Sequence, residues 1–233
     1  GATATAATVG LDKVDNAAVA NSDVTFTGAK LTDATFNVTG TASKVALLDV
    51  AAATAITINA TAALTSEIAT STAASTLTIT GTAKVDMDAG AMDADIDTIN
   101  ASANTGGLNL QLGTNGNDAT ITGSAGADLI TASTTNGLAT SDTLSVDAGD
   151  GTDTLAITDN VGGMSISVPS VTVTNIENAT ISTTGSVGVA AVSSVTGVEA
   201  VPQIRTITPT IVDATGTSSL SVGYGTGTWT SAV

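Results

Sequence analysis

Short runs in which apolar residues alternate with threonine recur along this chain, and each run ends at a glycine. Clear examples are residues 24–28 (Val-Thr-Phe-Thr-Gly), 36–40 (Phe-Asn-Val-Thr-Gly) and 77–81 (Leu-Thr-Ile-Thr-Gly). A period of two sends alternate side chains to the same face, so each run predicts a strand with one buried face. The glycine then allows the chain to turn. Many short strands with regular turn signals predict an all-β fold.

The repetition favours a β-solenoid, with an ordinary β-sandwich as the alternative. Threonine is stiff at its branched Cβ, fits a pleated surface and stacks in ladders between successive coils. A coil of roughly 20 residues would advance by about 4.8 Å, so the chain would build a rod or slab of on the order of ten coils. Residues 60–75, which include Glu67, are the one segment in which we expect a helix.

The expected core consists of small aliphatic side chains. Hydrophobic residues make up 42% of the 233 residues, but Phe26, Phe36, Tyr224 and Trp229 are the only aromatic ones. Such a core suits thin, stacked layers in which each position packs against its equivalent one coil away. Only three of the 21 acidic residues are glutamates, and aspartate favours turns and calcium sites over helices.

The net charge of −16, with only five basic residues, argues against nucleic acid as a partner and in favour of divalent cations. The sequence has no histidine and no cysteine, which excludes Ser-His-Asp and Cys-His catalysis and histidine metal ligands. Paired carboxylates cleave glycosides in some enzymes, but sugar sites stack rings on aromatic side chains, which are scarce here. We therefore expect no enzymatic activity. No apolar run approaches the roughly 18 residues of a membrane span, so we expect none.

Glycine- and aspartate-rich turns replace the threonine runs at the centre of the chain. Residues 113–118 read Gly-Thr-Asn-Gly-Asn-Asp, residues 126–130 read Gly-Ala-Asp-Leu-Ile, and residues 149–155 read Gly-Asp-Gly-Thr-Asp-Thr-Leu. These segments resemble the RTX nonapeptide, Gly-Gly-x-Gly-x-Asp-x-U-x, in which U is a large apolar residue. In the first segment Thr120 stands at the U position, and one extra residue separates it from the next repeat.

The RTX resemblance implies a β-roll in which Ca²⁺ lies between stacked turns. Glycine lets the backbone turn so that carbonyl oxygens point inward, and calcium takes about six to eight oxygen ligands. Carried over to this sequence, the resemblance places the ligand aspartates at Asp118, Asp128 and Asp153. The further candidate ligands, in the same turns or near them, are Asn115, Asn117, Asp150, Asp142 and Asp147.

Two flanking segments are similar to phrases of surface (S-) layer proteins of Gram-negative bacteria. Residues 96–110 contain Ile-Asp-Thr-Ile-Asn and Gly-Gly-Leu-Asn-Leu, and residues 171–182 run through an Ile-Glu step between two strands. The resemblance covers about residues 96–200. It implies a structural subunit of an extracellular surface layer, rigidified by Ca²⁺, self-assembled into a lattice or filament, and exported by type I secretion. RTX turns also occur in toxins, proteases and lipases, so two alternatives stay open: a secreted adhesin or biofilm-matrix protein, and the repeat domain of a larger secreted enzyme or toxin.

Three regions follow from these patterns: a Thr/Ala-rich solenoid-like region at 1–112, the RTX-like turns at 113–160, and a further solenoid-like or sandwich-like region at 161–233. The chain begins in Ala-Thr repeats without a signal peptide, so we expect a fragment of a longer protein. An anchor to cell-surface polysaccharide would then lie in parts outside this chain.

A second acidic cluster spans Asp86, Asp88, Asp93, Asp95 and Asp97. Asp86 and Asp88 alternate with Val85 and Met87, so we expect these two aspartates on the solvated face of a strand. The second part of the cluster reads Asp93-x-Asp95-x-Asp97. It imitates the start of an EF-hand loop, but Thr98 stands where that loop requires glycine. A solvated face or an intersubunit contact is therefore favoured over calcium binding in this cluster.

Overall fold

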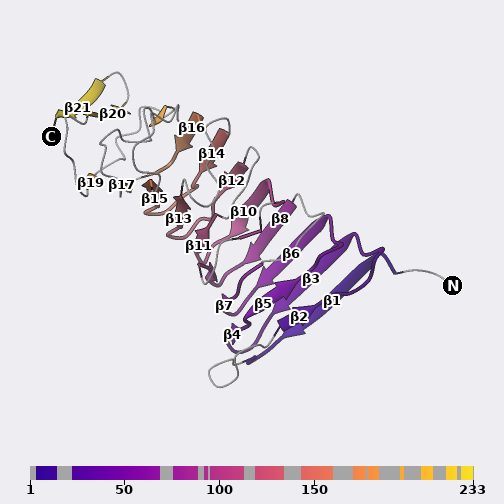
Figure 1. Ribbon diagram of the computed structural model, residues 1–233. Coiled ribbons are helices and arrows are strands. Elements are labelled where there is room, and N and C mark those ends of the chain that lie inside the picture. Colours follow the sequence, from indigo (N-terminus) through magenta and orange to yellow (C-terminus); the bar gives the residue numbers. More distant parts are fainter. Residues whose placement is uncertain are drawn as a thin grey trace.

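The computed structural model describes residues 4–14, 23–68, 76–88, 92–93, 95–112, 119–133, 143–159, 170–176, 178–183, 195–196, 206–211, 219–224 and 227–232. These residues form strands, turns and loops, and no helix occurs among them. The strands stack one above another along a single long axis (Figure 1). The all-β prediction is confirmed.

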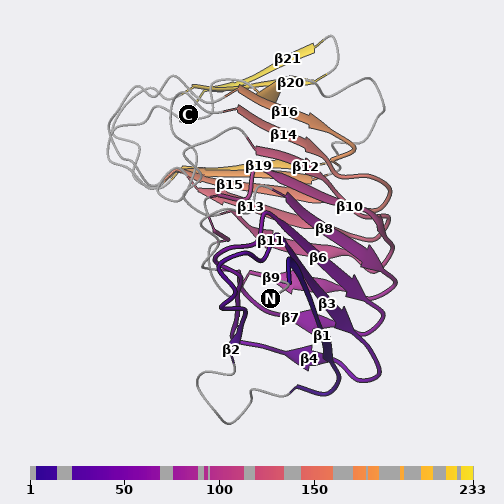
Figure 2. The ribbon, with the colours of Figure 1, turned by 90° about the vertical axis from the view of Figure 1, so that its right-hand side faces the viewer.

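Two parallel sheets form the body of the molecule, and the chain alternates between them (Figures 1 and 2). In spatial order, the nine-stranded sheet contains β1 (Ala6–Leu11), β3 (Asp33–Val38), β6 (Ala55–Ala60), β8 (Thr76–Gly81), β10 (Thr98–Asn104), β12 (Ala119–Thr122), β14 (Thr143–Asp147), β16 (Ser170–Thr174) and β18 (Val195–Thr196). The eight-stranded sheet contains β4 (Ser43–Lys44), β7 (Leu64–Thr65), β9 (Val85–Met87), β11 (Leu108–Gln111), β13 (Leu129–Ser133), β15 (Thr154–Asp159), β17 (Asn178–Thr183) and β19 (Thr206–Ile211).

Two small sheets complete the described structure. Strands β2 (Asp23–Thr25) and β5 (Leu47–Asp49) are parallel and belong to the first coils, whereas β20 (Ser219–Tyr224) and β21 (Gly227–Ala232) form an antiparallel pair. A parallel pair needs a long crossover between its strands, and here each crossover from β3 onward passes through the opposite sheet. This path is a β-solenoid, so the β-sandwich alternative is wrong.

Each coil places chemically similar residues above one another. Asp33 pairs with Ala55 and Ala55 pairs with Thr76, so one coil takes about 22 residues. On the inner face, Ile56, Leu77 and Ile99 stack in register, and all three are buried. The expected core of stacked aliphatic side chains is therefore present.

The outer face of the nine-stranded sheet carries hydroxyl and amide side chains. Thr35, Thr57 and Thr78 lie in register on β3, β6 and β8. Beside them, Asn59 Nδ2 donates to Asn37 Oδ1 over 2.7 Å. These side chains form rows along the solenoid axis, as the threonine-rich sequence predicts.

The helix predicted at residues 60–75 is wrong where the structure describes it. Ala60 ends β6, and Leu64 and Thr65 form β7. The backbone of this segment bonds to the neighbouring coils: Thr61 N donates to Val38 O over 2.9 Å, and Glu67 O accepts from Leu48 N over 2.8 Å. Pairing between coils thus overrides the local preference. Residues 69–75 lie outside the described residues.

Candidate functional site in the glycine-rich turns

The glycine-rich turns lie where the chain passes from the nine-stranded to the eight-stranded sheet. These turns are residues 104–108, 123–128 and 147–153, which join β10 to β11, β12 to β13, and β14 to β15. They contain four of the predicted calcium ligands: Asp128, Asp147, Asp150 and Asp153. The other four, Asn115, Asn117, Asp118 and Asp142, lie outside the described residues.

Successive glycine-rich turns approach one another so closely that no Cβ atom fits between their backbones. A Cβ on Gly106 would lie 2.1 Å from the carbonyl carbon of Ala83. A Cβ on Gly126 would lie 2.5 Å from the amide nitrogen of Gly107. Non-bonded carbon atoms prefer about 3.5–4.0 Å. These glycines are therefore required for the stacking of coils, independently of any metal.

One buried column of the eight-stranded sheet changes its chemistry along the solenoid axis. We call it the inner column; its members, in order, are Ser43, Leu64, Val85, Leu108, Asp128 and Asp153. All six side chains are buried. The column is apolar in its middle coils and acidic in the glycine-rich turns.

The two buried aspartates continue a hydrogen-bond ladder between coils. In an earlier coil, Val85 N donates to the main-chain oxygen of Gly107 over 3.1 Å. In the glycine-rich turns a carboxylate accepts instead: Leu108 N donates to Asp128 Oδ1 over 2.8 Å, and Asp128 N donates to Asp153 Oδ1 over 2.8 Å. Each aspartate thus takes the N–H of the inner-column residue one coil before it, which would otherwise be buried without an acceptor.

Asp128 also accepts from two donors in its own turn. Besides Leu108 N, Asp128 Oδ1 accepts from Ser124 Oγ over 2.6 Å, and Oδ2 accepts from Ser124 N over 2.7 Å. The residue is only 3% exposed. Burial raises the pKa of Asp128 above its ordinary value, and the hydrogen bonds from Ser124 and Leu108 oppose that rise in part.

Two buried polar residues that the sequence reasoning missed hold the turns in shape. Gly126 N donates to Ser124 Oγ over 3.0 Å, and Gly106 N donates to Asn104 Oδ1 over 2.9 Å. Asn104 Nδ2 also donates to the main-chain oxygen of Ala83 over 3.0 Å. The available signal was a polar residue two positions before a glycine, a spacing at which the side chain accepts from the glycine N–H.

Asp147 and Asp150 differ from the buried pair because both are exposed. Asp147 Oδ1 accepts from Asn175 Nδ2 over 2.8 Å, and more weakly from Gly149 N over 3.3 Å. Asn175 has a φ of 55°, a conformation that asparagine tolerates better than most residues. This turn therefore presents carboxylate groups to solvent.

The described residues fit calcium only in part. Protein donors contact both carboxylate oxygens of Asp128, so a cation there would share these oxygens with them, and calcium ligation by Asp128 stays a prediction. Within the described residues, no three acidic side chains lie close enough together to hold a metal ion. For the exposed Asp147 and Asp150, for Asp153, and for the four candidates outside the described residues, calcium ligation stays a prediction.

In the second acidic cluster, Asp95 is exposed, and Asp93 and Asp97 are partly exposed. Asp93 Oδ1 accepts from Asp95 N over 3.0 Å, which closes a local turn. Asp95 thus lies on a solvated face, whereas Asp97 Oδ1 is buried and has no hydrogen-bond partner among the described residues, so the role of this cluster stays a prediction.

No known protein-family model, curated protein or solved structure matches this chain. Among the described residues, no helix is long and apolar enough to cross a membrane. The function is therefore inferred from the geometry of the chain itself.

Proposed function

We propose that this chain is a structural module of an extracellular surface layer, which assembles with copies of itself and binds Ca²⁺ through its turn region. The observation that carries this proposal is the uninterrupted stack of parallel strands, which runs from β1 to β18 in one sheet and from β4 to β19 in the other. At about 4.8 Å per strand, nine strands span roughly 38 Å. A rod of this kind covers distance with few residues.

The outer face of the nine-stranded sheet supports packing between copies. From β6 to β12, the outward-facing residues are alanine, threonine, asparagine and serine: Ala55, Thr57, Asn59, Thr76, Thr78, Thr80, Thr98, Asn100, Ser102, Thr120 and Thr122. Between β6 and β12 this face carries no charge, although the chain has a net charge of −16. Copies of so acidic a chain repel one another, and a neutral, regular face lowers that cost where two copies meet.

The calcium part of the proposal is supported by the resemblance of the turns to RTX repeats and by the exposed carboxylates of Asp147 and Asp150. A cation shared between exposed carboxylates would reduce repulsion within and between copies. The proposed ligands are the exposed pair, Asp153, and the candidates in segments 113–118 and 141–142.

The test is assembly of the purified chain, followed by negative-stain electron microscopy and sedimentation velocity, with millimolar calcium and with a chelator. We expect ordered sheets or filaments with calcium and smaller species with the chelator. Calcium binding is measured separately by equilibrium dialysis, with magnesium as the control ion. Monodisperse particles under both conditions would remove the support for a self-assembling layer and favour an adhesin or an accessory repeat domain.

A further inference from the structure

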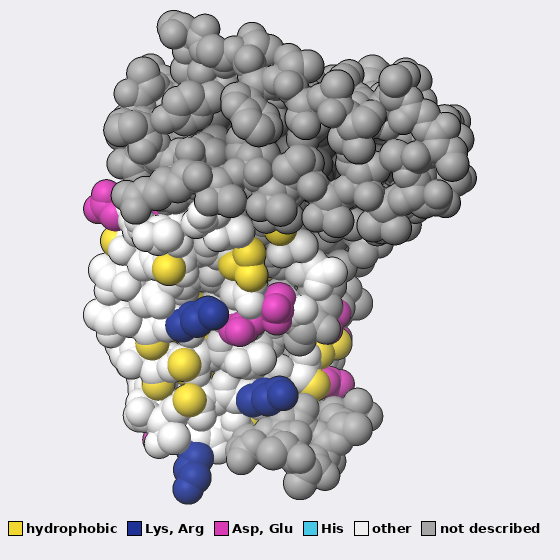
Figure 3. Space-filling view, turned by 90° about the vertical axis from the view of Figure 1, so that its left-hand side faces the viewer, with side chains coloured by type: hydrophobic (Ala, Val, Ile, Leu, Met, Phe, Trp, Pro, Cys, Tyr) yellow, Lys and Arg dark blue, Asp and Glu magenta, His cyan; other side chains and the backbone are white. Residues whose placement is uncertain are grey.

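Positive charge is concentrated at one end of the solenoid. Residues 1–84 contain four of the five basic residues and six acidic ones, whereas residues 85–233 contain only Arg205 against fifteen acidic ones. The net charge is therefore −2 in the first part and −14 in the second. Figure 3 shows basic side chains along one face of the described coils, with acidic side chains beside one of them.

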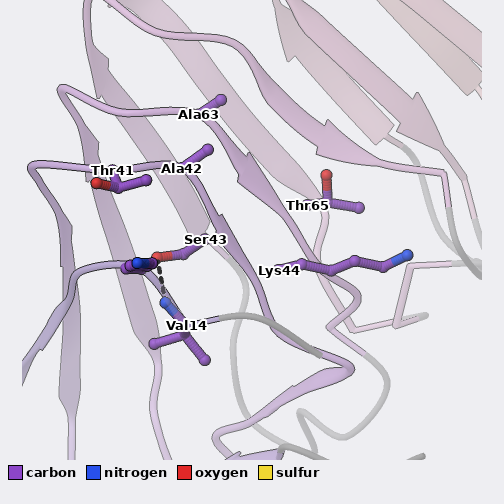
Figure 4. Close-up of a pocket in the computed structure, with 8 residues that line it drawn as sticks. Val14, Thr41, Ala42, Ser43, Lys44, Ala63 and Thr65 are labelled. Carbon is purple, nitrogen blue, oxygen red and sulfur yellow. Dashed lines mark hydrogen bonds between the residues drawn. The ribbon is translucent and has the colours of Figure 1, made fainter. Parts of the chain in front are cut away.

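An open pocket of about 340 Å³ lies at the basic end, where β4 begins the eight-stranded sheet. Lys13 and Lys44 line it together with the hydroxyl-bearing Thr41, Ser43 and Thr65. Figure 4 shows that the lining residues come from neighbouring coils, and that the side chain of Lys44 extends away from Thr41 and Ala42. The Ser43 hydroxyl is buried against Val14 N, so the two lysines, Thr41 and Thr65 are the groups that this end offers to a carboxylate.

The pocket is held in place by the backbone of the first coils. Lys44 N donates to Val14 O over 2.6 Å, and Val14 N donates to the buried Ser43 Oγ over 3.2 Å. Lys13 has a φ of 53°, so the chain turns sharply at this residue. The neighbouring Asp12 is already engaged, since its Oδ1 accepts from Thr41 N over 2.9 Å.

The lysines of the pocket have no ion-pair partner among the described residues, in contrast to Lys84. Lys84 Nζ lies 4.0 Å from Asp86 Oδ2, which is the one ion pair in the described part of the chain. Lys13 and Lys44 are both exposed and are therefore available to a partner.

We call the edge at which the chain passes from the nine-stranded to the eight-stranded sheet the corner of the solenoid. This corner is basic in the first coils and acidic in the later coils. Lys13 follows β1 and Lys44 follows shortly after β3, whereas Asp147 ends β14 and Asp150 follows it. Five strand steps separate β3 from β14, which is about 24 Å at the usual strand spacing. The Debye length is about 8 Å at physiological salt, so the two ends of one copy do not neutralise each other.

We infer that this corner binds a second copy of the chain in antiparallel orientation, with the lysine pocket of each copy facing Asp147 and Asp150 of the other. This inference rests on the proposed self-assembly and names one of its contacts. A two-fold axis makes the contact isologous, so both basic ends meet both acidic ends at once. Charge complementarity is the argument for this partner, because the charged side chains exposed elsewhere on the described residues are acidic except for Lys30 and Lys84.

The experiment is a charge-swap pair, Lys44→Glu and Asp150→Lys, measured by sedimentation velocity over a range of concentrations. Both positions are exposed, so the variants should fold like the wild type, which circular dichroism checks. Each variant alone places like charges at the contact, and we expect its self-association to weaken about tenfold or more. An equimolar mixture restores one native and one reversed ion pair per dimer, so it should associate close to the wild-type level.

Lys30→Glu is the matched control, because it makes the same change of charge at an exposed site outside the pocket. It should leave association nearly unchanged. Association of both swap variants at the wild-type level, or a mixture that stays as weak as either variant, would overturn the antiparallel contact while leaving self-assembly intact. Absence of association by the wild type itself, with calcium or with chelator, would instead contradict the proposed function. Each sample is measured with calcium and with chelator. This separates an ion pair at Asp150 from a calcium bridge there, because mixing the two variants restores association only through the ion pair.

Discussion

The early coils and the glycine-rich turns build the same inner column with different chemistry. At Leu64 and Val85 an apolar side chain fills the core, and main-chain carbonyl oxygens accept the N–H groups between coils. At Asp128 and Asp153 the carboxylate side chain fills the column and also accepts the N–H. The donors are Leu108 N and Asp128 N, each one coil earlier. A solenoid thus tolerates a buried charge where the turn supplies enough donors.

The turns of the early coils and the glycine-rich turns also differ in the groups that hold neighbouring coils together. In the early coils, the Thr61 hydroxyl donates to the main-chain oxygen of Val38 over 3.1 Å, and the coils are held by neutral groups. In the glycine-rich turns, the backbones approach so closely that side chains beyond hydrogen are excluded at Gly106 and Gly126. Gly81 at the end of β8 approaches Ala60 as closely, so the later coils differ chiefly in their buried carboxylates, and we expect them to be more sensitive to pH than the early coils.

The largest expected effect comes from Gly106→Ala. The new Cβ would meet main-chain atoms of Ala83 at 2.1–2.6 Å, and a backbone atom cannot move aside as a flexible side chain can. We expect a loss of about 3 kcal/mol or more in the free energy of unfolding, measured by urea denaturation. The matched control is Gly10→Ala on β1, where no atom lies within 4 Å of the new Cβ. Equal stability of the two variants would show that the coils can separate at no cost.

The second prediction concerns Asp128→Leu, which replaces a buried carboxylate of the inner column by the apolar side chain that the column has at Leu64. The N–H groups of Leu108 and Ser124 then lose their acceptor inside the protein. Since an unsatisfied buried donor costs about 1–3 kcal/mol, we expect the free energy of unfolding to fall by roughly 2–3 kcal/mol. Asp23→Leu, at an exposed position on β2, is the control and should have little effect. If Asp128→Leu were as stable as the wild type, the carboxylate would have no part in the ladder between coils.

Much of the fold could be predicted from the sequence because the strand signal is local. The alternation of apolar residues and threonine around Phe36 and Leu77 fixes which face is buried, and the solenoid follows from its repetition. The failure at residues 60–68 has a physical reason: alanine favours a helix locally, but here its backbone groups pair with coils that lie about 22 residues away in the sequence. No local pattern reports that pairing.

The candidate site was only partly predictable for a related reason. The motif singled out Asp128 and Asp153 as calcium ligands, which stays a prediction, and the structure places both among the buried polar residues. It did not reveal that Asp128 accepts from Leu108 N, because these residues are 20 positions apart and meet only through stacking. Nor did it reveal the pocket of Lys13 and Lys44, since neither lysine belongs to a motif and the pocket forms only where three coils meet.

The smallest expected effect is a pH dependence confined to the glycine-rich turns. Burial raises the pKa of Asp128 in the folded chain, so the folded state holds this proton to higher pH than the unfolded state does. Protonation of Asp128 therefore adds stability below the ordinary aspartate pKa, and that contribution is lost as the pH rises through the raised value. Asp128→Asn has no such titration, so the wild-type free energy of unfolding minus that of the variant should fall as the pH rises across this window. Each unit between the two pKa values corresponds to about 1.4 kcal/mol.

Urea denaturation of both proteins at several acidic pH values, with a chelator present, measures this difference. The subtraction removes the titration of the other carboxylates that the two proteins share. Thr61→Val, in an early coil, is the reference, because its difference from the wild type involves no titrating group and should stay constant with pH. A difference for Asp128→Asn that grew with rising pH would mean that the three donors around Asp128 outweigh its burial. The inner column would then favour the charged carboxylate, as it would if the turn had been built to hold an anion.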